Sequence, residues 1–415
     1  LDNGLTVLTD TIETVDSVAV GLWCQSGSRF ETKKNNGIAH FLEHMVFKGT
    51  ENRSAHDIAL EIESVGGSIN AYTSREMTAY HARILKEHLD TALDIIADIL
   101  LNPAFPQAEL ERERGVVLQE ISMYYDSPSD HVFELFQSSM YGDHPLGWSI
   151  LGPAKNVTAF DSGDLIDFMS NHYKPQNLIL AAAGHLDHEK LVSRAEALFG
   201  HLKKNASPAA PPAHYQGGYA IETREQLEQI HLTLGFEAPA FDHTDHLPAR
   251  MVAGILGSGM SSRLFQEIRE KRGLVYAISG FTHAYSDSGF IGFYAGTGPD
   301  KVEELMPTLC DELLKIRDSI SQEEIDNVKA RIRSGMLMGM ESTYGRCNRL
   351  AQSMIQYGHP KDIQTRLAEI EAISENDIQR VAAAIFTTPP TLTAVGRPEQ
   401  LPDMEGLKSM LKSTL

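Results

Sequence analysis

The sequence predicts an α+β protein with two homologous domains, each an antiparallel-rich sheet with packed helices, joined by a linker. Two observations lead to this fold class. The chain has 415 residues, more than one hydrophobic core usually supports, so at least two domains are expected. Segments of the first half also recur in the second half, and internal repeats of this kind indicate duplicated structural units.

Two pairs of segments are similar in sequence: 62–84 with 268–290, and 106–120 with 321–335. In the first pair Gly67 matches Gly273 and Ala71 matches Ala277. Each half has the same order of strands, a helix, a strand hairpin, a helix and a long acidic helix. We therefore interpret the two halves as copies of one α+β unit.

The composition changes once, at KKNASPAAPPAHYQGG, which has neither helical nor strand periodicity. We assign residues 204–218 to the linker. The first domain is then predicted to span 1–203 and the second 219–415.

Charge and composition exclude several classes of function. The formal net charge is −20, which makes nucleic acid and anionic membranes poor partners and favours cationic substrates, although it can also serve solubility alone. No apolar run approaches the roughly 20 residues of a membrane span, so none is expected. Three widely spaced cysteines argue against a disulfide framework and against a thiolate zinc site, and they fit a reducing compartment.

The stretch GIAHFLEHMVFKGT, residues 37–50, contains two histidines and a glutamate on little more than one helical turn. His40 and His44 are four apart, so on a helix their imidazoles project from one face and can share a metal. Glu43 reaches the same face, where a carboxylate can move a proton between water and a leaving amine. This is the inverted zincin motif HxxEH. The alternative is a pair of core histidines with a solvated glutamate.

A catalytic zinc needs a third protein ligand, and the segment AELERERGVVLQEI is the best source. Pro106 predicts a helix start, and Glu113 and Glu120 are two turns apart on one face of that helix. Carboxylates on a half-buried face need partners, which a metal would supply. In the second half Val328 and Gly335 take these positions and the histidine pair is missing, so a metal site would belong to the first half only.

With these residues the chain resembles the pitrilysin-type, or inverzincin, metallopeptidases, in the short-subunit branch of the mitochondrial processing peptidase and its bacterial relatives. In that family a glutamate ligand follows HxxEH by about 75 residues, and an acidic residue precedes this ligand by about seven. Here Glu120 lies 76 positions after His44, and Glu113 precedes Glu120 by seven. The family's other segments are matched by GGSINAYTSREMTAYH, HPLGWSILG, HYKPQNLILAAAGHLDHEKL and SSRLFQEIREKRGLVYAIS.

The resemblance implies a zinc endopeptidase with one Zn²⁺ per chain, acting on unfolded peptides or short polypeptides. His40, His44 and Glu120 would bind the metal, and Glu43 would be the general base. Glu113 would orient one of the histidines, as carboxylates behind metal ligands do. Its alternative role is that of a surface carboxylate in an acidic helix.

The resemblance also implies how the substrate binds. Asn70 and Ala71 would lie on an edge strand that accepts the peptide as an added β-strand, although Asn70 could be a turn residue instead. Arg269 and Tyr276 would bind a substrate carbonyl or carboxylate and the oxyanion, or would be an ordinary surface arginine and core tyrosine.

The larger members of the family fuse two such units, and there the arginine and tyrosine come from the second unit. This chain corresponds to one unit, so Arg269 and Tyr276 are expected to complete the site of a partner in a C2 homodimer that encloses a chamber. A heterodimer with an inactive paralogue is the alternative. A bacterial cytoplasm is the expected location, with the periplasm and the mitochondrial matrix left open.

The acidic charge suggests that basic, presequence-like peptides are preferred. Two other functions compete with proteolysis: a structural or assembly subunit, like the core proteins of a respiratory complex, and a module that captures peptides without cutting them. The intact HxxEH motif argues against both.

Overall fold

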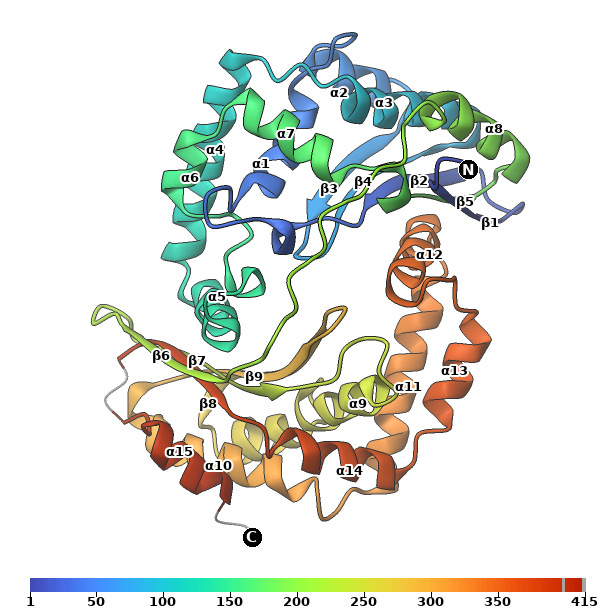
Figure 1. Cartoon of the computed structure of the whole chain (residues 1–415). Coiled ribbons are helices and arrows are strands. Elements are labelled where there is room, and N and C mark those ends of the chain that lie inside the picture. The colour runs from blue at the N-terminus through green and yellow to red at the C-terminus, as the bar shows by residue number, and fades with distance from the viewer. Residues whose placement is uncertain (398–399, 413–415) are drawn as a thin grey trace. The chain divides into compact units, whose positions relative to one another are not determined.

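The computed structural model describes residues 1–397 and 400–412 of the chain (Figure 1). These residues form two compact units, each with one five-stranded sheet. The first unit comprises residues 1–122, 148–211 and 336–361, and the second comprises 123–147, 212–335 and the chain from 362 onward.

The first sheet consists of β1 (Thr6–Thr11), β2 (Ser17–Cys24), β3 (Ser68–Thr73), β4 (Thr78–Leu85) and β5 (Leu178–Gly184). Its strand order is β1-β5-β2-β4-β3, with β1 parallel to β5 and every other pair antiparallel. β3 is therefore an edge strand.

The second sheet consists of β6 (Gly218–Thr223), β7 (Ile230–Glu237), β8 (Val275–Ala284), β9 (Gly289–Thr297) and β10 (Thr391–Gly396). The order β6-β10-β7-β9-β8, with β6 parallel to β10, repeats the topology of the first sheet. The α+β prediction with a duplicated unit is thus confirmed. The repeat also extends to the long helices, because α4 begins at Gln107 and α11 at Gln322, which are matched positions.

The helices of the first unit are α1 (Ile38–Met45), α2 (Ala55–Glu63), α3 (Leu89–Leu101), most of α4 (Gln107–Asp126), α6 (Ala154–Ala159), α7 (Ser162–His172), α8 (His188–Phe199) and α12 (Thr343–Tyr357). Those of the second are α5 (Pro128–Tyr141), α9 (His246–Gly257), α10 (Val302–Lys315), most of α11 (Gln322–Gly339), α13 (Ile363–Glu371), α14 (Glu375–Ile385) and α15 (Met404–Lys412). Within the described residues, every helix is too short or too polar to cross a membrane.

Both faces of the first sheet are buried, each in its own core. Along β2, Val18, Val20 and Leu22 belong to the large core that includes α1 and α3. The alternate residues Ala19 and Trp23 belong to a smaller core on the other face. This period of two follows from the pleat, which turns successive side chains to opposite faces.

The smaller core is completed by α12, through Cys347, Leu350 and Ala351. α12 comes from the C-terminal half of the chain but packs on the first sheet, and α5 comes from the N-terminal half but packs on β6, β7 and β10. The compact units therefore differ from the ranges 1–203 and 219–415 by the segments 123–147 and 336–361, which contain these two helices. Their exchange covers the second apolar face of each sheet. Residues 204–217 of the predicted linker have no regular secondary structure, whereas its last residue, Gly218, is the first residue of β6.

Candidate metal centre

Helix α1 is held at its N-terminus by a buried carboxylate. Its N-cap residue, Gly37, has a φ of +99°, and a Cβ there would come within 2.6 Å of the Leu151 carbonyl oxygen, so a side-chain cap is ruled out. Glu31 takes over this role by accepting hydrogen bonds from the backbone N–H groups of Gly37 (2.9 Å) and Ala39 (2.8 Å). Asn36 Nδ2 donates to the same carboxylate at 2.8 Å. Glu31 therefore anchors the helix that carries the histidines.

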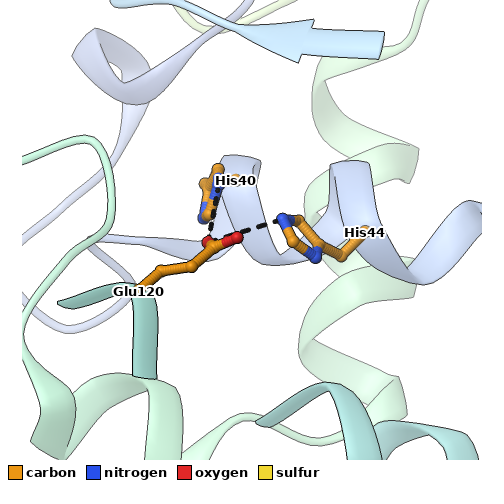
Figure 2. A group of neighbouring side chains, drawn as sticks. All are labelled: His40, His44 and Glu120. Carbon is orange, nitrogen blue, oxygen red and sulfur yellow. Dashed lines mark ion pairs between the residues drawn. The ribbon is translucent and has the colours of Figure 1, made fainter. Parts of the chain in front are cut away.

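His40 and His44 of α1 converge on Glu120 of α4 (Figure 2). The Nε2 atoms of His40 and His44 lie 3.6 and 3.7 Å from Glu120 Oε2. Within the described residues these three form the only group of histidine, cysteine or acidic side chains whose ligand atoms come within 4.8 Å of one another. Metal–ligand distances of about 2.0–2.2 Å for zinc fit between atoms spaced in this way, and the His₂Glu donor set suits zinc.

The electrostatics of His40 also fit a metal ligand. Burial lowers the pKa of His40 to about 4, with a smaller contribution from His44. The imidazole is therefore neutral near pH 7, and a neutral ring is the form that binds a metal.

Glu113 lies behind His44 and is itself paired. Its Oε2 is 3.1 Å from His44 Nδ1, and its Oε1 is 2.6 Å from Lys48 Nζ. Glu113 is only 4% exposed, so it is not the surface carboxylate of the alternative interpretation. A carboxylate in this place accepts the Nδ1–H hydrogen of His44 and leaves Nε2 free to face a metal. Lys48 balances the buried charge.

Glu43 lies on α1, directly before His44 in sequence. Burial raises the pKa of its carboxyl group, and the nearby Glu120 charge raises it further, while Thr73 and His44 oppose the shift. A carboxylate with a raised pKa is a stronger base and can accept a proton from water more readily.

Strand β3 runs beside α1 and leaves one edge open. Among the described residues it pairs only with β4. The hairpin closes with a hydrogen bond from Ser74 N to Met77 O, and antiparallel pairs alternate between bonded and non-bonded. The peptide groups of Ile69, Ala71 and Thr73 therefore point to the open edge. Ala71 N–H donates instead to the side chain of the exposed Asn70, at 2.8 Å.

Arg269 and Tyr276 belong to the second compact unit. The Arg269 guanidinium lies 4.5 Å from the centre of the Phe265 ring, within the π-helix Phe265–Lys271. Tyr276 is 76% exposed and sits at a β-bulge, where the register of β8 shifts between Val275 and Ala277. Tyr276 is therefore not a core residue of this unit, and both side chains are accessible on it.

Sequence reasoning missed Glu31 and Lys48. Lys48 follows His44 by four residues, a helical spacing that could have indicated a shared face. Glu31 lies in a loop before α1, and no local pattern marks it as a helix anchor.

Two family models match this chain, and the similar proteins include zinc proteases. Residues 6–154 match the family described as insulinase, peptidase family M16, and residues 159–332 match the peptidase M16 inactive domain. An uncharacterized zinc protease of Rickettsia felis is 42% identical over 400 residues, which cover 95% of this chain and 96% of that protein. The uncharacterized zinc protease YmxG of Bacillus subtilis is 34% identical over 404 residues, covering 96% and 98%.

A solved structure is similar over nearly the full chain. The crystal structure of a protease from Helicobacter pylori superposes with a TM-score of 0.89 at 26% identity, covering 95% of this chain and 98% of that one. The likeness therefore extends over both sheets.

Proposed function

The chain belongs to the M16 family of zinc metallopeptidases, and from this premise we propose that it is an endopeptidase that cleaves unfolded peptides or short polypeptides bound along β3. The observation that carries the proposal is the convergence of His40, His44 and Glu120 beside an open strand edge. A peptide added to that edge would extend past the metal ligands. Main-chain hydrogen bonds would hold it with little dependence on its sequence.

A zinc ion held by His40, His44 and Glu120 would supply Lewis-acid polarisation of the scissile carbonyl group and of water. Glu43 would take a proton from the attacking water at its carboxylate oxygen and pass it to the leaving amine. Glu113 would accept the Nδ1–H hydrogen of His44 and hold that ring in place. No covalent bond between enzyme and substrate is needed.

The variant Glu43→Gln tests the reaction. It keeps the shape of the side chain but removes the base, so zinc content by atomic absorption should stay at the wild-type level while cleavage of a quenched peptide falls at least about 100-fold. Glu111→Gln is a matched control, because Glu111 is an exposed carboxylate on α4 that pairs with Arg114. Full activity of Glu43→Gln with zinc bound would refute the assigned role.

We further propose that two chains form a homodimer in which Arg269 and Tyr276 act at the partner's metal centre. The support is their accessibility on the second unit and the resemblance to fused relatives. Glu43→Gln and Tyr276→Phe should each be inactive alone. An equimolar mixture should regain up to about a quarter of wild-type activity after subunit exchange. Random exchange makes half of the dimers mixed, and each mixed dimer carries both defects in one site and leaves its other site intact. An inactive mixture with proven exchange would exclude completion of the site across subunits.

The net charge of −20 supports a preference for basic, presequence-like peptides. Matched basic and acidic peptides should differ in kcat/KM at low salt and converge at high salt, because exposed charges are screened. Equal cleavage at both salt concentrations would contradict the preference. For location we propose a bacterial cytoplasm, on the basis of bacterial relatives and three buried, unpaired cysteines. Cell fractionation tests this.

A further inference from the structure

The strand proposed to receive the substrate, β3, is contacted by α12, which packs on the face of the sheet opposite to α1. Within the first unit α12 packs on β1, β2 and β5, and Cys347 Sγ donates to the Ala181 carbonyl oxygen at 3.2 Å. α12 also reaches β3 and the hairpin that β3 forms with β4. The contact is made by the Tyr72 side chain, which lies next to Ala71 in β3.

The Tyr72 hydroxyl group has three hydrogen-bond partners. It accepts hydrogen bonds from Trp23 Nε1 of β2 at 3.1 Å and from Gln352 Nε2 of α12 at 3.2 Å. It donates to Asn348 Oδ1 of α12 at 3.3 Å. One donor and two acceptor positions are therefore filled, which is the full capacity of a hydroxyl group.

The same helix also holds the turn of the hairpin. Gln352 Nε2 lies 3.1 Å from Met77 Sδ, and Met77 accepts the bond from Ser74 N that closes the turn. Asn348 and Gln352 are four residues apart and so project from one face of α12. Two side chains of one helix face therefore hold both β3 and the turn that follows it.

These contacts matter because β3 has a neighbour strand on one side only. An edge strand lacks the second ladder of hydrogen bonds that fixes a central strand. Tyr72 points toward α12, whereas the peptide groups of Ala71 and Thr73 on either side of it point to the open edge. Fixing Tyr72 therefore fixes the direction in which these two groups are presented.

We infer that Tyr72 is a positioning residue, through which α12 of the C-terminal half aligns the edge of β3 for an incoming peptide. This inference rests on the proposed function, since it requires the substrate to bind along β3. Tyr72 contacts neither the metal ligands nor the reacting bond in this account. Its effect should therefore appear in peptide binding rather than in the chemical step.

Tyr72→Phe tests the inference, because it keeps the ring and removes only the hydroxyl group. We expect KM for an extended peptide to rise about threefold to tenfold, because the strand edge loses the three hydrogen bonds that hold Tyr72. The value of kcat should stay within about twofold of wild type. Zinc content should be unchanged. Amide hydrogen exchange should accelerate in 68–73 but not in β5.

Tyr344→Phe is the matched control. Tyr344 also lies on α12 and packs on His81, with ring centres 4.5 Å apart, but its hydroxyl group has no hydrogen-bond partner among residues 1–397 and 400–412. Its KM should stay at the wild-type value. In a double-mutant cycle, Tyr72→Phe with Gln352→Met should raise KM by less than the product of the two single effects, because both variants remove the hydrogen bond between Tyr72 and Gln352.

Several outcomes would overturn the inference. A purely structural role predicts a lower melting temperature with unchanged KM at 25 °C, and independent action predicts multiplying effects in the cycle. The variant Ala71→Pro, which removes an N–H group that faces the open edge of the same strand, separates the two proposals. If that variant loses peptide binding while Tyr72→Phe does not, binding along β3 stands and the positioning role fails. If the Ala71 variant cleaves normally, binding along β3 itself is refuted.

Discussion

Replacing Ala71 by proline should weaken productive peptide binding about tenfold without unfolding the protein. Proline lacks the backbone N–H group, and it is tolerated on edge strands where that group faces outward. Ala71 meets this condition because its N–H group donates to the Asn70 side chain and not to β4. Asn70, the preceding residue, is already extended in β3, as proline requires of its neighbour.

The size of the effect follows from these contacts. The lost bond to the exposed Asn70 side chain is replaceable by water, so the free energy of unfolding should change by less than about 1 kcal/mol. A bound peptide would lose one hydrogen bond and meet the proline ring at the edge, which together should cost about 1.4 kcal/mol or more. That corresponds to a rise in KM of about tenfold.

Ala79→Pro is the matched control, since it makes the same chemical change in the neighbouring strand. Ala79 is fully buried in β4 and pairs with Trp23 on one side and Tyr72 on the other. Removing its N–H group leaves a carbonyl oxygen in the interior without a donor, at a cost of about 1–3 kcal/mol. The melting temperature of Ala79→Pro should therefore fall, whereas that of Ala71→Pro should not.

The assays are thermal denaturation, zinc content, and steady-state cleavage of a quenched extended peptide. Wild-type KM in Ala71→Pro, with normal zinc content and stability, would refute binding of the substrate along β3. Equal destabilisation by the two proline variants would refute the assignment of an outward-facing N–H group at Ala71.

Two further predictions concern the metal site and stability. Lys48→Met should weaken zinc binding about tenfold, measured by competition with a fluorescent chelator, because the buried Glu113 carboxylate loses a partner. Lys34→Met, at an exposed lysine, is the control. Equal zinc affinities of the Lys48 variant and the wild type would contradict the role of Lys48. Burial lowers the pKa of His172 to about 4, so between pH 6.5 and 4 the unfolded chain binds a proton that the folded chain excludes, and stability should fall by about 2–3 kcal/mol as pH falls through this range. His172→Gln should reduce the dependence of the free energy of unfolding on pH between about 6.5 and 4, as measured by urea denaturation. An unchanged dependence would contradict the role of His172.

Much of the metal centre could be predicted from local sequence. His40, Glu43 and His44 lie within one turn of a helix, and the face they share is set by helical geometry alone. Glu113 and Glu120 lie on a second helix, and their separation by two helical turns is again a local property. The duplication of the fold was visible because the similar segments lie in the same order in both halves.

Other features depend on segments that are far apart in the chain. Lys48 neutralises Glu113 of α4 because the tertiary fold brings the two residues together. Glu31 is close to α1 in sequence, but it caps the helix through a loop whose conformation no local pattern predicts. The exchange of α5 and α12 between the compact units has no signal in a linear division of the chain. The reason is that each helix is apolar on one face whichever sheet it covers, so its sequence pattern names no partner.

The division between the two kinds of information is sharpest at β3. The resemblance in sequence implied a strand with Asn70 and Ala71, and both residues do lie on one. Which peptide groups face outward depends on the register with β4, and what holds Tyr72 depends on Asn348 and Gln352, which lie 276 and 280 residues away. Local periodicity specifies which residues form an element and which face is apolar, whereas register and partners come from packing between elements that only the folded chain brings together.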